Sequence, residues 1–226
     1  MPEEPSPWTD VAGKAFDDAK RLFKDGHYSE ALERHEWFHE HALEFKSSYY
    51  GVRLSYALRH WKELADVYPP AMDSLISIRD RDTQRLLDGN GSPQLLHDVD
   101  SMNDALEQTD ATLALFRRLE TAHPELARQS FAYIDRLCLR SDPALFRRHC
   151  SDPVSFYRQQ RESYFRSTIF LRERGCSDNS EQDEARLELR ELAAQIIKAF
   201  SEDSDIASKV SRLESTTDDE LTRRLE

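Results

Sequence analysis

The sequence contains few of the residues that build turns or crosslink small folds. Only 6 of its 226 residues are glycine and 3 are cysteine. The low glycine content, and the lack of alternating β-branched runs between turns, argue against a fold built from β-hairpins. The cysteines, Cys138, Cys150 and Cys176, are odd in number and lack metal-ligand spacing, which argues against a disulfide framework. Reduced thiols of this kind fit the cytoplasm.

Long hydrophobic runs are missing as well. No apolar run approaches the ~20 residues that a helix needs to span a bilayer. The first residues, Met1-Pro2-Glu3-Glu4-Pro5, are acidic and proline-rich, unlike the basic and then apolar plan of a signal peptide. We therefore expect a cytoplasmic protein without a membrane partner.

Basic residues are outnumbered by acidic ones, and the formal net charge is −12. This balance argues against nucleic acid as a main partner, because phosphate binding needs clustered lysine and arginine. The excess is uneven: residues 177–226 hold 14 acidic and 7 basic residues, a balance of −7, whereas residues 1–176 have a balance of −5. We therefore predict two parts, a helical domain over 1–176 and an acidic part over 177–226.

Helical periodicity dominates what the sequence does contain, and it predicts an all-α fold. Capping residues, prolines at helix starts and glycine stops divide the first part into helices. The expected helices begin near residues 10, 28, 49, 69, 92, 109 and 124, and the third runs without a break from Tyr49 to Val67. Two copies of Ser-Asp-Pro-x-x-Phe, at Ser141 and Ser151, each predict a further helix start.

Residues 177–226 contain one more amphipathic pattern, from Ala185 to Phe200. Its apolar stripe makes a homo-oligomer formed through this C-terminal helix an open alternative to its docking on the rest of the chain. The last 25 residues are polar, and we expect them to form a frayed or disordered tail.

Two segments resemble the tetratricopeptide repeat family. Gly26-x-Tyr28-Ser29-Glu30-Ala31-Leu32 is similar to the middle of such a repeat, and Phe116-x-x-Leu119-x-x-x-x-Pro124 is similar to its end. The segment from His35 to His41 and on to Arg53 also resembles a group of bacterial tetratricopeptide-like proteins. The resemblance implies antiparallel helical hairpins stacked as a short solenoid. Such a stack leaves a curved groove suited to a peptide or helix, so we expect a non-enzymatic protein- or peptide-binding scaffold without a cofactor.

One motif points to a different function. His35-Glu36-x-x-His39 places two histidines four residues apart, where they could bind zinc with Glu36 as the general base of a hydrolase. A third ligand is not evident, although Glu63 lies downstream. The alternative interpretation is that His35 lies half-buried on the apolar stripe of its helix, and both interpretations stay open at this stage.

A second set of residues suggests a binding face. Tyr49, Arg53, Tyr56 and His60 recur at spacings of 4, 3 and 4 on the expected third helix. Arginine and tyrosine together could grip a carboxylate or an acidic peptide, and the repeat family would place this helix in its concave groove. Trp37, which lies off the apolar stripe, is either an exposed anchor for a partner or is covered by that helix.

Overall fold

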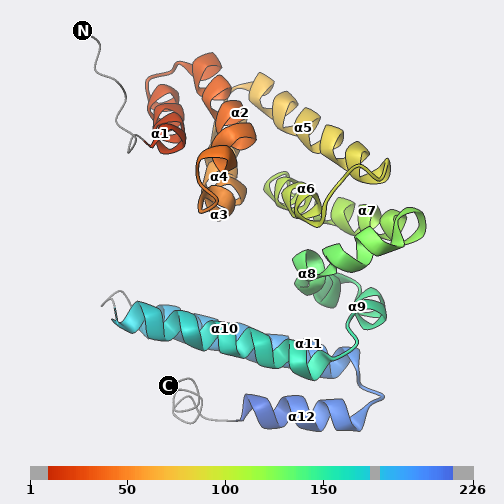
Figure 1. Cartoon of the computed structure of the whole chain (residues 1–226). Helices are drawn as coiled ribbons and strands as arrows, with labels where there is room; N and C mark the ends of the chain where they lie inside the picture. Colours follow the sequence, from red (N-terminus) through yellow and green to blue (C-terminus); the bar gives the residue numbers. More distant parts are fainter. Residues whose placement is uncertain (1–9, 174–178, 216–226) are drawn as a thin grey trace. The chain divides into compact units, whose positions relative to one another are not determined.

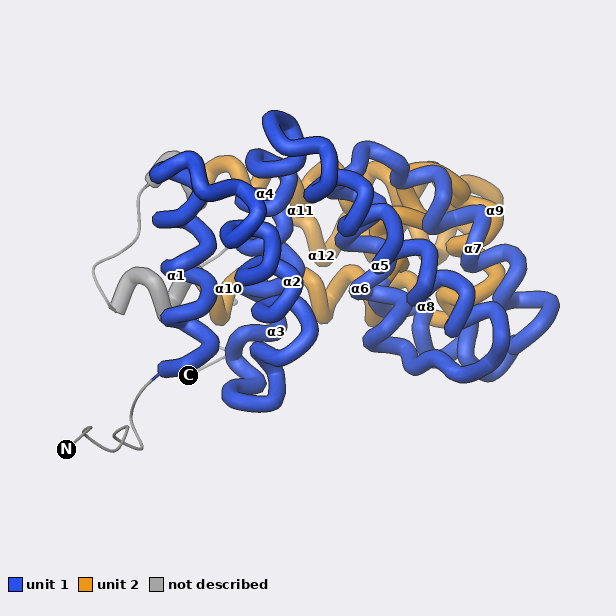
Figure 2. Tube along the Cα trace, turned by 90° about the horizontal axis from the view of Figure 1, so that it is seen from above, with its two compact units in different colours: residues 1–133 blue, residues 134–226 orange. Residues whose placement is uncertain are grey.

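The structure is a computed structural model, and it describes residues 10–173 and 179–215. Every regular element in this part of the chain is an α-helix, which confirms the all-α prediction. None of the described helices is apolar over a stretch long enough to cross a membrane. The chain divides into two compact units, unit 1 over residues 1–133 and unit 2 over residues 134–226 (Figure 2).

The sequence predicts a boundary at residue 176 instead. The two units meet between Tyr133 and Ile134, inside a continuous helix, so no change of composition marks the boundary. Charge patterning detects the acidic C-terminal part, but it cannot detect where one core ends and the next begins within a helix. The two units are described separately below.

Unit 1 consists of short helices that follow one another closely along the chain (Figure 1). They are α1 (Val11–Lys24), α2 (Tyr28–Phe45), α3 (Tyr49–Leu54), α4 (Tyr56–Ala65), α5 (Pro69–Leu87), α6 (Pro93–Ala105), α7 (Thr109–Ala122) and the first half of α8 (Pro124–Ser141).

The helix ends of unit 1 follow from local chemistry. The Asp10 side chain caps α1 by accepting a hydrogen bond from the Gly13 amide at 2.9 Å. Gly26 turns the chain into α2 with a φ of 79°, a conformation that only glycine adopts without cost. Ser92 caps α6 in the same way as Asp10 caps α1, and Pro93 occupies its first turn, where no amide donor is needed.

The expected third helix is wrong in one respect, because it is broken at Ser55. This residue has φ −126° and ψ −84°, which separates α3 from α4. The Ser55 hydroxyl donates to the Gly51 carbonyl at 2.7 Å, a side-chain bond that competes with helical geometry. The spacing of 4, 3 and 4 from Tyr49 to His60 therefore does not define one continuous helix face.

The helices of unit 1 pack both with their neighbours in sequence and with the helix after next. α1 packs on α2, α4 on α5, α5 on α6 and α6 on α7, while α2 also packs against α4, α4 against α6, and α5 against α7. The largest buried side chain of the unit, Trp61, donates from its indole N–H to the Ala71 carbonyl at 3.0 Å and so joins α4 to α5. These contacts bury apolar side chains of α1, α2 and α4 to α7.

Unit 2 contains the second half of α8, α9 (Pro143–His149), α10 (Pro153–Glu173), α11 (Asn179–Ala199) and α12 (Ser204–Glu214). Both Ser-Asp-Pro segments start helices as predicted, and in each the aspartate is the cap: Asp142 accepts from Leu145, and Asp152 accepts from Ser155. α10, α11 and α12 each pack against the other two.

The expected frayed tail is not what the structure shows for residues 204–214. These residues form α12, which Asp203 caps, and Val210 on this helix is fully buried. The helix is short, with 11 residues, and Val210 is its one fully buried residue, so periodicity in the sequence is weak. The final residues, 216–226, lie outside the described part of the chain.

Candidate functional site

His35, Glu36, Trp37 and His39 lie on α2, which presents two different faces. The inner face contains the residues of α2 that are buried in unit 1: Ala31, His35, Phe38, His39 and Ala42. The outer face contains Trp37, His41 and Phe45, which follow one another at intervals of four residues. The zinc motif therefore contributes its histidines to the inner face, and Trp37 stands apart from them.

His35 lies in an aromatic environment. Only 2% of the residue is exposed, and its ring stacks on Trp61 at 5.8 Å between centroids and meets Phe16 edge-on at 6.3 Å. Neither ring nitrogen has a hydrogen-bond partner. Burial, followed by the nearby His60, lowers the pKa of His35 to about 4, so the ring is neutral at pH 7.

His39 belongs to a buried polar chain. Arg53, from α3, donates to the His39 Nε2 at 3.3 Å and to the Asp98 carboxylate of α6 at 2.6 Å. Arginine can only donate, so Nε2 must be the acceptor and the proton must sit on Nδ1. Burial first, and then the Arg53 charge, lower the pKa of His39 to about 3. The hydrogen bonds among His39, Arg53 and Asp98 thus join α2, α3 and α6 in the core.

The geometry of the motif is unfavourable for zinc. The lone pair that His39 would offer to a metal is already used by Arg53, whose positive charge would also repel a cation. Glu36 accepts a hydrogen bond from the Ser74 hydroxyl, and Glu63 interacts with His60 at 2.8 Å. Within the described ranges, no three His, Cys, Asp or Glu side chains gather where they could hold a metal ion.

The predicted binding face is divided by the structure. Arg53 is 5% exposed, so a partner could use it only by displacing Asp98. Tyr49 packs against Phe38, and its hydroxyl donates to Asp10; burial, more than this bond, raises the pKa of Tyr49 to about 12.

The other two members of that face lie on α4. Tyr56 is 57% exposed, with the Arg59 guanidinium 4.9 Å from its ring centre. His60 is partly exposed and faces Glu63. The four residues are therefore not brought together: Tyr49 and Arg53 belong to the core around α3, and Tyr56 and His60 belong to the surface of α4.

Trp37 is a predicted site residue that is partly exposed and borders an open hollow. Its ring packs on the edge of the core cluster around Phe38 while remaining partly exposed. On the outer face it neighbours His41 at 5.3 Å and Phe45 at 5.7 Å, and 49% of Phe45 is exposed. The sequence left two interpretations of Trp37, and it is both packed and accessible.

We call the hollow between α1 and α2 the Trp37 hollow. It has a volume of about 350 Å³, and its lining residues are Val11, Lys14, Ala15, Asp18, Arg34 and Trp37. Sequence reasoning did not single out Lys14 and Arg34. The signal was present, because Val11, Lys14, Ala15 and Asp18 follow the 3-1-3 spacing of one helix face, but nothing in the sequence alone pairs that face with α2.

A second hollow in unit 1 lies beside the start of α6 and has a volume of about 360 Å³. Arg53, Asp98 and the exposed Arg85 are among its lining residues. The arginines are already paired, Arg53 with Asp98 and Arg85 with Asp82. The charged side chains here therefore stabilise one another and leave no unpaired arginine to bind a ligand.

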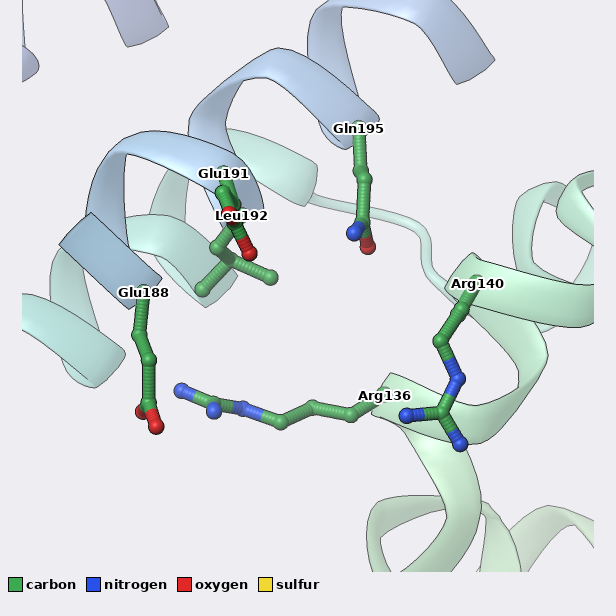
Figure 3. A pocket seen from close by; sticks show the side chains of 6 residues that line it. All are labelled: Arg136, Arg140, Glu188, Glu191, Leu192 and Gln195. Atoms are coloured by element: carbon green, nitrogen blue, oxygen red, sulfur yellow. The ribbon is translucent and has the colours of Figure 1, made fainter. Parts of the chain in front are cut away.

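Unit 2 contains a hollow of about 270 Å³ that we call the Arg136 hollow (Figure 3). α8 contributes Arg136 and Arg140, and α11 contributes Glu188 and Glu191 together with Leu192 and Gln195. In Figure 3 the Arg136 side chain extends from α8 toward Glu188. Two positive and two negative side chains balance here, and a single apolar residue lines the space.

Comparison with known proteins adds no relative: no family model and no curated protein matches the sequence, and no solved structure matches the fold.

Proposed function

We propose that the protein is a non-enzymatic scaffold that binds a peptide segment of a partner protein. The observation that carries this proposal is the Trp37 hollow, an accessible space between two helices with a partly exposed tryptophan at its edge. Tryptophan is enriched among the residues that dominate binding energy, because it buries a large area at little cost in conformational entropy. The aromatic outer face of α2, with Phe45 beside Trp37, extends the same surface.

The proposal includes a solenoid of the tetratricopeptide type for unit 1. Its support is the packing of successive helices together with the pairs α2 with α4, α4 with α6 and α5 with α7, a pattern that fits stacked hairpins. Cys138 and Cys150 are buried and form no disulfide with any residue that the structure describes, which supports a reducing compartment such as the cytoplasm. Self-association through α11 stays a prediction, supported by Leu187, which is 56% exposed.

A display library of random 12-residue peptides tests the binding function directly. Panning on the full chain is expected to enrich peptides that bind the Trp37→Ala variant about 30-fold more weakly, the effect of losing a residue worth about 2 kcal/mol. Gln195→Ala, in the Arg136 hollow, is the control and should leave their binding unchanged. Because Trp37 also packs on the core, the fold of each variant is checked by circular dichroism. Enriched peptides that bind folded Trp37→Ala as tightly as the original chain would contradict the proposal.

A further inference from the structure

The Trp37 hollow has an excess of positive charge although the chain as a whole is acidic. Lys14 on α1 and Arg34 on α2 line it, and neither forms an ion pair with any residue that the structure describes. The single acidic residue in the lining, Asp18, already accepts a hydrogen bond from Arg21 at 3.0 Å. Two uncompensated cations thus remain, in a protein with a formal net charge of −12.

The two cations come from different helices, so they stand on opposite walls of the hollow. α1 and α2 pack side by side as a hairpin (Figure 1). The surface between the cations is apolar: Val11 is 42% exposed, and Ala15 and Trp37 lie beside it. A volume of about 350 Å³ is at the lower end of the range for ligand sites, which suits one or two apolar side chains.

We propose that the occupant of this hollow is an acidic segment of a partner protein with an apolar anchor. This inference rests on the proposed function and adds the chemical class of the partner. The anchor, an aromatic or aliphatic side chain, lies against Trp37 and Val11. Carboxylates on both sides of the anchor pair with Lys14 and Arg34. The anchor supplies most of the affinity, and the carboxylates select the partner and speed its association.

The test uses three displayed peptide libraries that share randomised apolar anchor positions and differ only in their flanking residues. The flanks are glutamate, glutamine or lysine. Panning on the full chain gives the enrichment of each library. A parallel panning on Trp37→Ala identifies peptides that bind elsewhere, and these are removed. We expect glutamate flanks to be enriched at least about fivefold over glutamine flanks, as two exposed ion pairs would give. The library with lysine flanks should be enriched least.

Charge reversal provides the matched variants. The double variant Lys14→Glu/Arg34→Glu is expected to reverse the order and favour lysine flanks. Lys24→Glu, an exposed lysine of α1 outside the hollow, is the control and should leave the order unchanged. Raising the salt concentration from about 50 to about 300 mM should weaken the glutamate-flanked peptides most, because salt screens exposed charges.

The outcomes separate this inference from the function it rests on. Trp37-dependent enrichment that is equal for all three flanks, or highest for lysine, would overturn the acidic partner and leave the peptide-binding function standing. No Trp37-dependent enrichment in any library would overturn both. Glutamate preference that survives the double charge reversal would assign the selectivity to other residues and overturn the roles of Lys14 and Arg34.

Discussion

The two faces of α2 contain similar residues, yet they differ in what those residues can do. The inner face has His35 and His39, buried and neutral, in contact with Trp61. The outer face has Trp37 and His41 beside Phe45, all at least partly exposed. A histidine motif typical of metal sites thus serves packing in one direction, while aromatic residues off the core stripe form the accessible surface. Burial and neighbours, more than residue type, decide the chemistry of each face.

The largest expected effect concerns the buried ion pair behind the inner face. Asp98→Ala would leave the Arg53 charge buried without its partner, which costs about 3–5 kcal/mol of the free energy of unfolding. Urea denaturation measures this loss. Asp104→Ala, an exposed acid of the same helix, is the control and should change stability by less than about 0.5 kcal/mol.

The same variant sharpens the contrast between the two faces. If the inner face is structural, folded Asp98→Ala should keep the peptide binding of the original chain. Unchanged stability combined with lost binding would instead place Arg53 in the binding site, as its sequence pattern predicts.

His35 is expected to lower the free energy of unfolding by about 3 kcal/mol as the pH falls. Its pKa is about 4 in the folded chain and near 6.5 when unfolded, so only the unfolded state takes up a proton between these values. The stability from keeping this ring neutral is complete above pH 6.5 and is lost as the pH falls toward 4. Urea denaturation at pH 7.5 and pH 5 should show about 2 kcal/mol of this fall, since the rest lies below pH 5.

The variant His35→Leu tests this assignment. It removes one of two buried histidines with a lowered pKa and should reduce the pH dependence by about half, with His39 supplying the rest. Because neither nitrogen of His35 has a partner, the substitution should cost little at pH 7.5. A loss above about 3 kcal/mol at that pH, or an unchanged pH dependence, would show that the ring makes interactions other than apolar packing.

Local chemistry made much of this fold predictable. The Asp10 cap, Gly26 and Pro69 fixed helix ends because each acts within one turn of the chain. The break at Ser55 was missed because the apolar stripe continues across it, and the competing bond to Gly51 has no periodic signature. α12 was missed because it is short and is stabilised by packing on α10 and α11, which its own sequence does not reveal.

The candidate site was less predictable for the same reason. Trp37 could be singled out by its position off the apolar stripe of α2. Lys14 and Arg34 could not, because their charges acquire meaning only when α1 and α2 are placed side by side. Arg53 shows the converse: its spacing indicated a surface role, but Asp98, 45 residues later, holds it in the core.

A smaller effect is expected at the far end of the outer face. Phe45→Ser removes an exposed ring near Trp37 without opening the core, so stability should change by less than about 1 kcal/mol. Binding of a 12-residue glutamate-flanked peptide should weaken about threefold, as expected of a residue beside the main anchor. Fluorescence anisotropy of the labelled peptide measures its dissociation constant for the original chain and for the variant. Loss of binding as large as that for Trp37→Ala would move the centre of the site along α2.

The smallest expected effect is that of zinc on the inner face. Because His39 Nε2 already accepts from Arg53, adding zinc to the full chain should change the melting temperature by less than about 1 °C. A real site would respond strongly: zinc at 100 times its dissociation constant adds about 2.7 kcal/mol, or several degrees in a chain of this size. Such a rise, absent in His39→Leu, would mean that His39 leaves Arg53 to bind metal. The two faces of α2 would then exchange roles, and the hydrolase alternative would become the leading one.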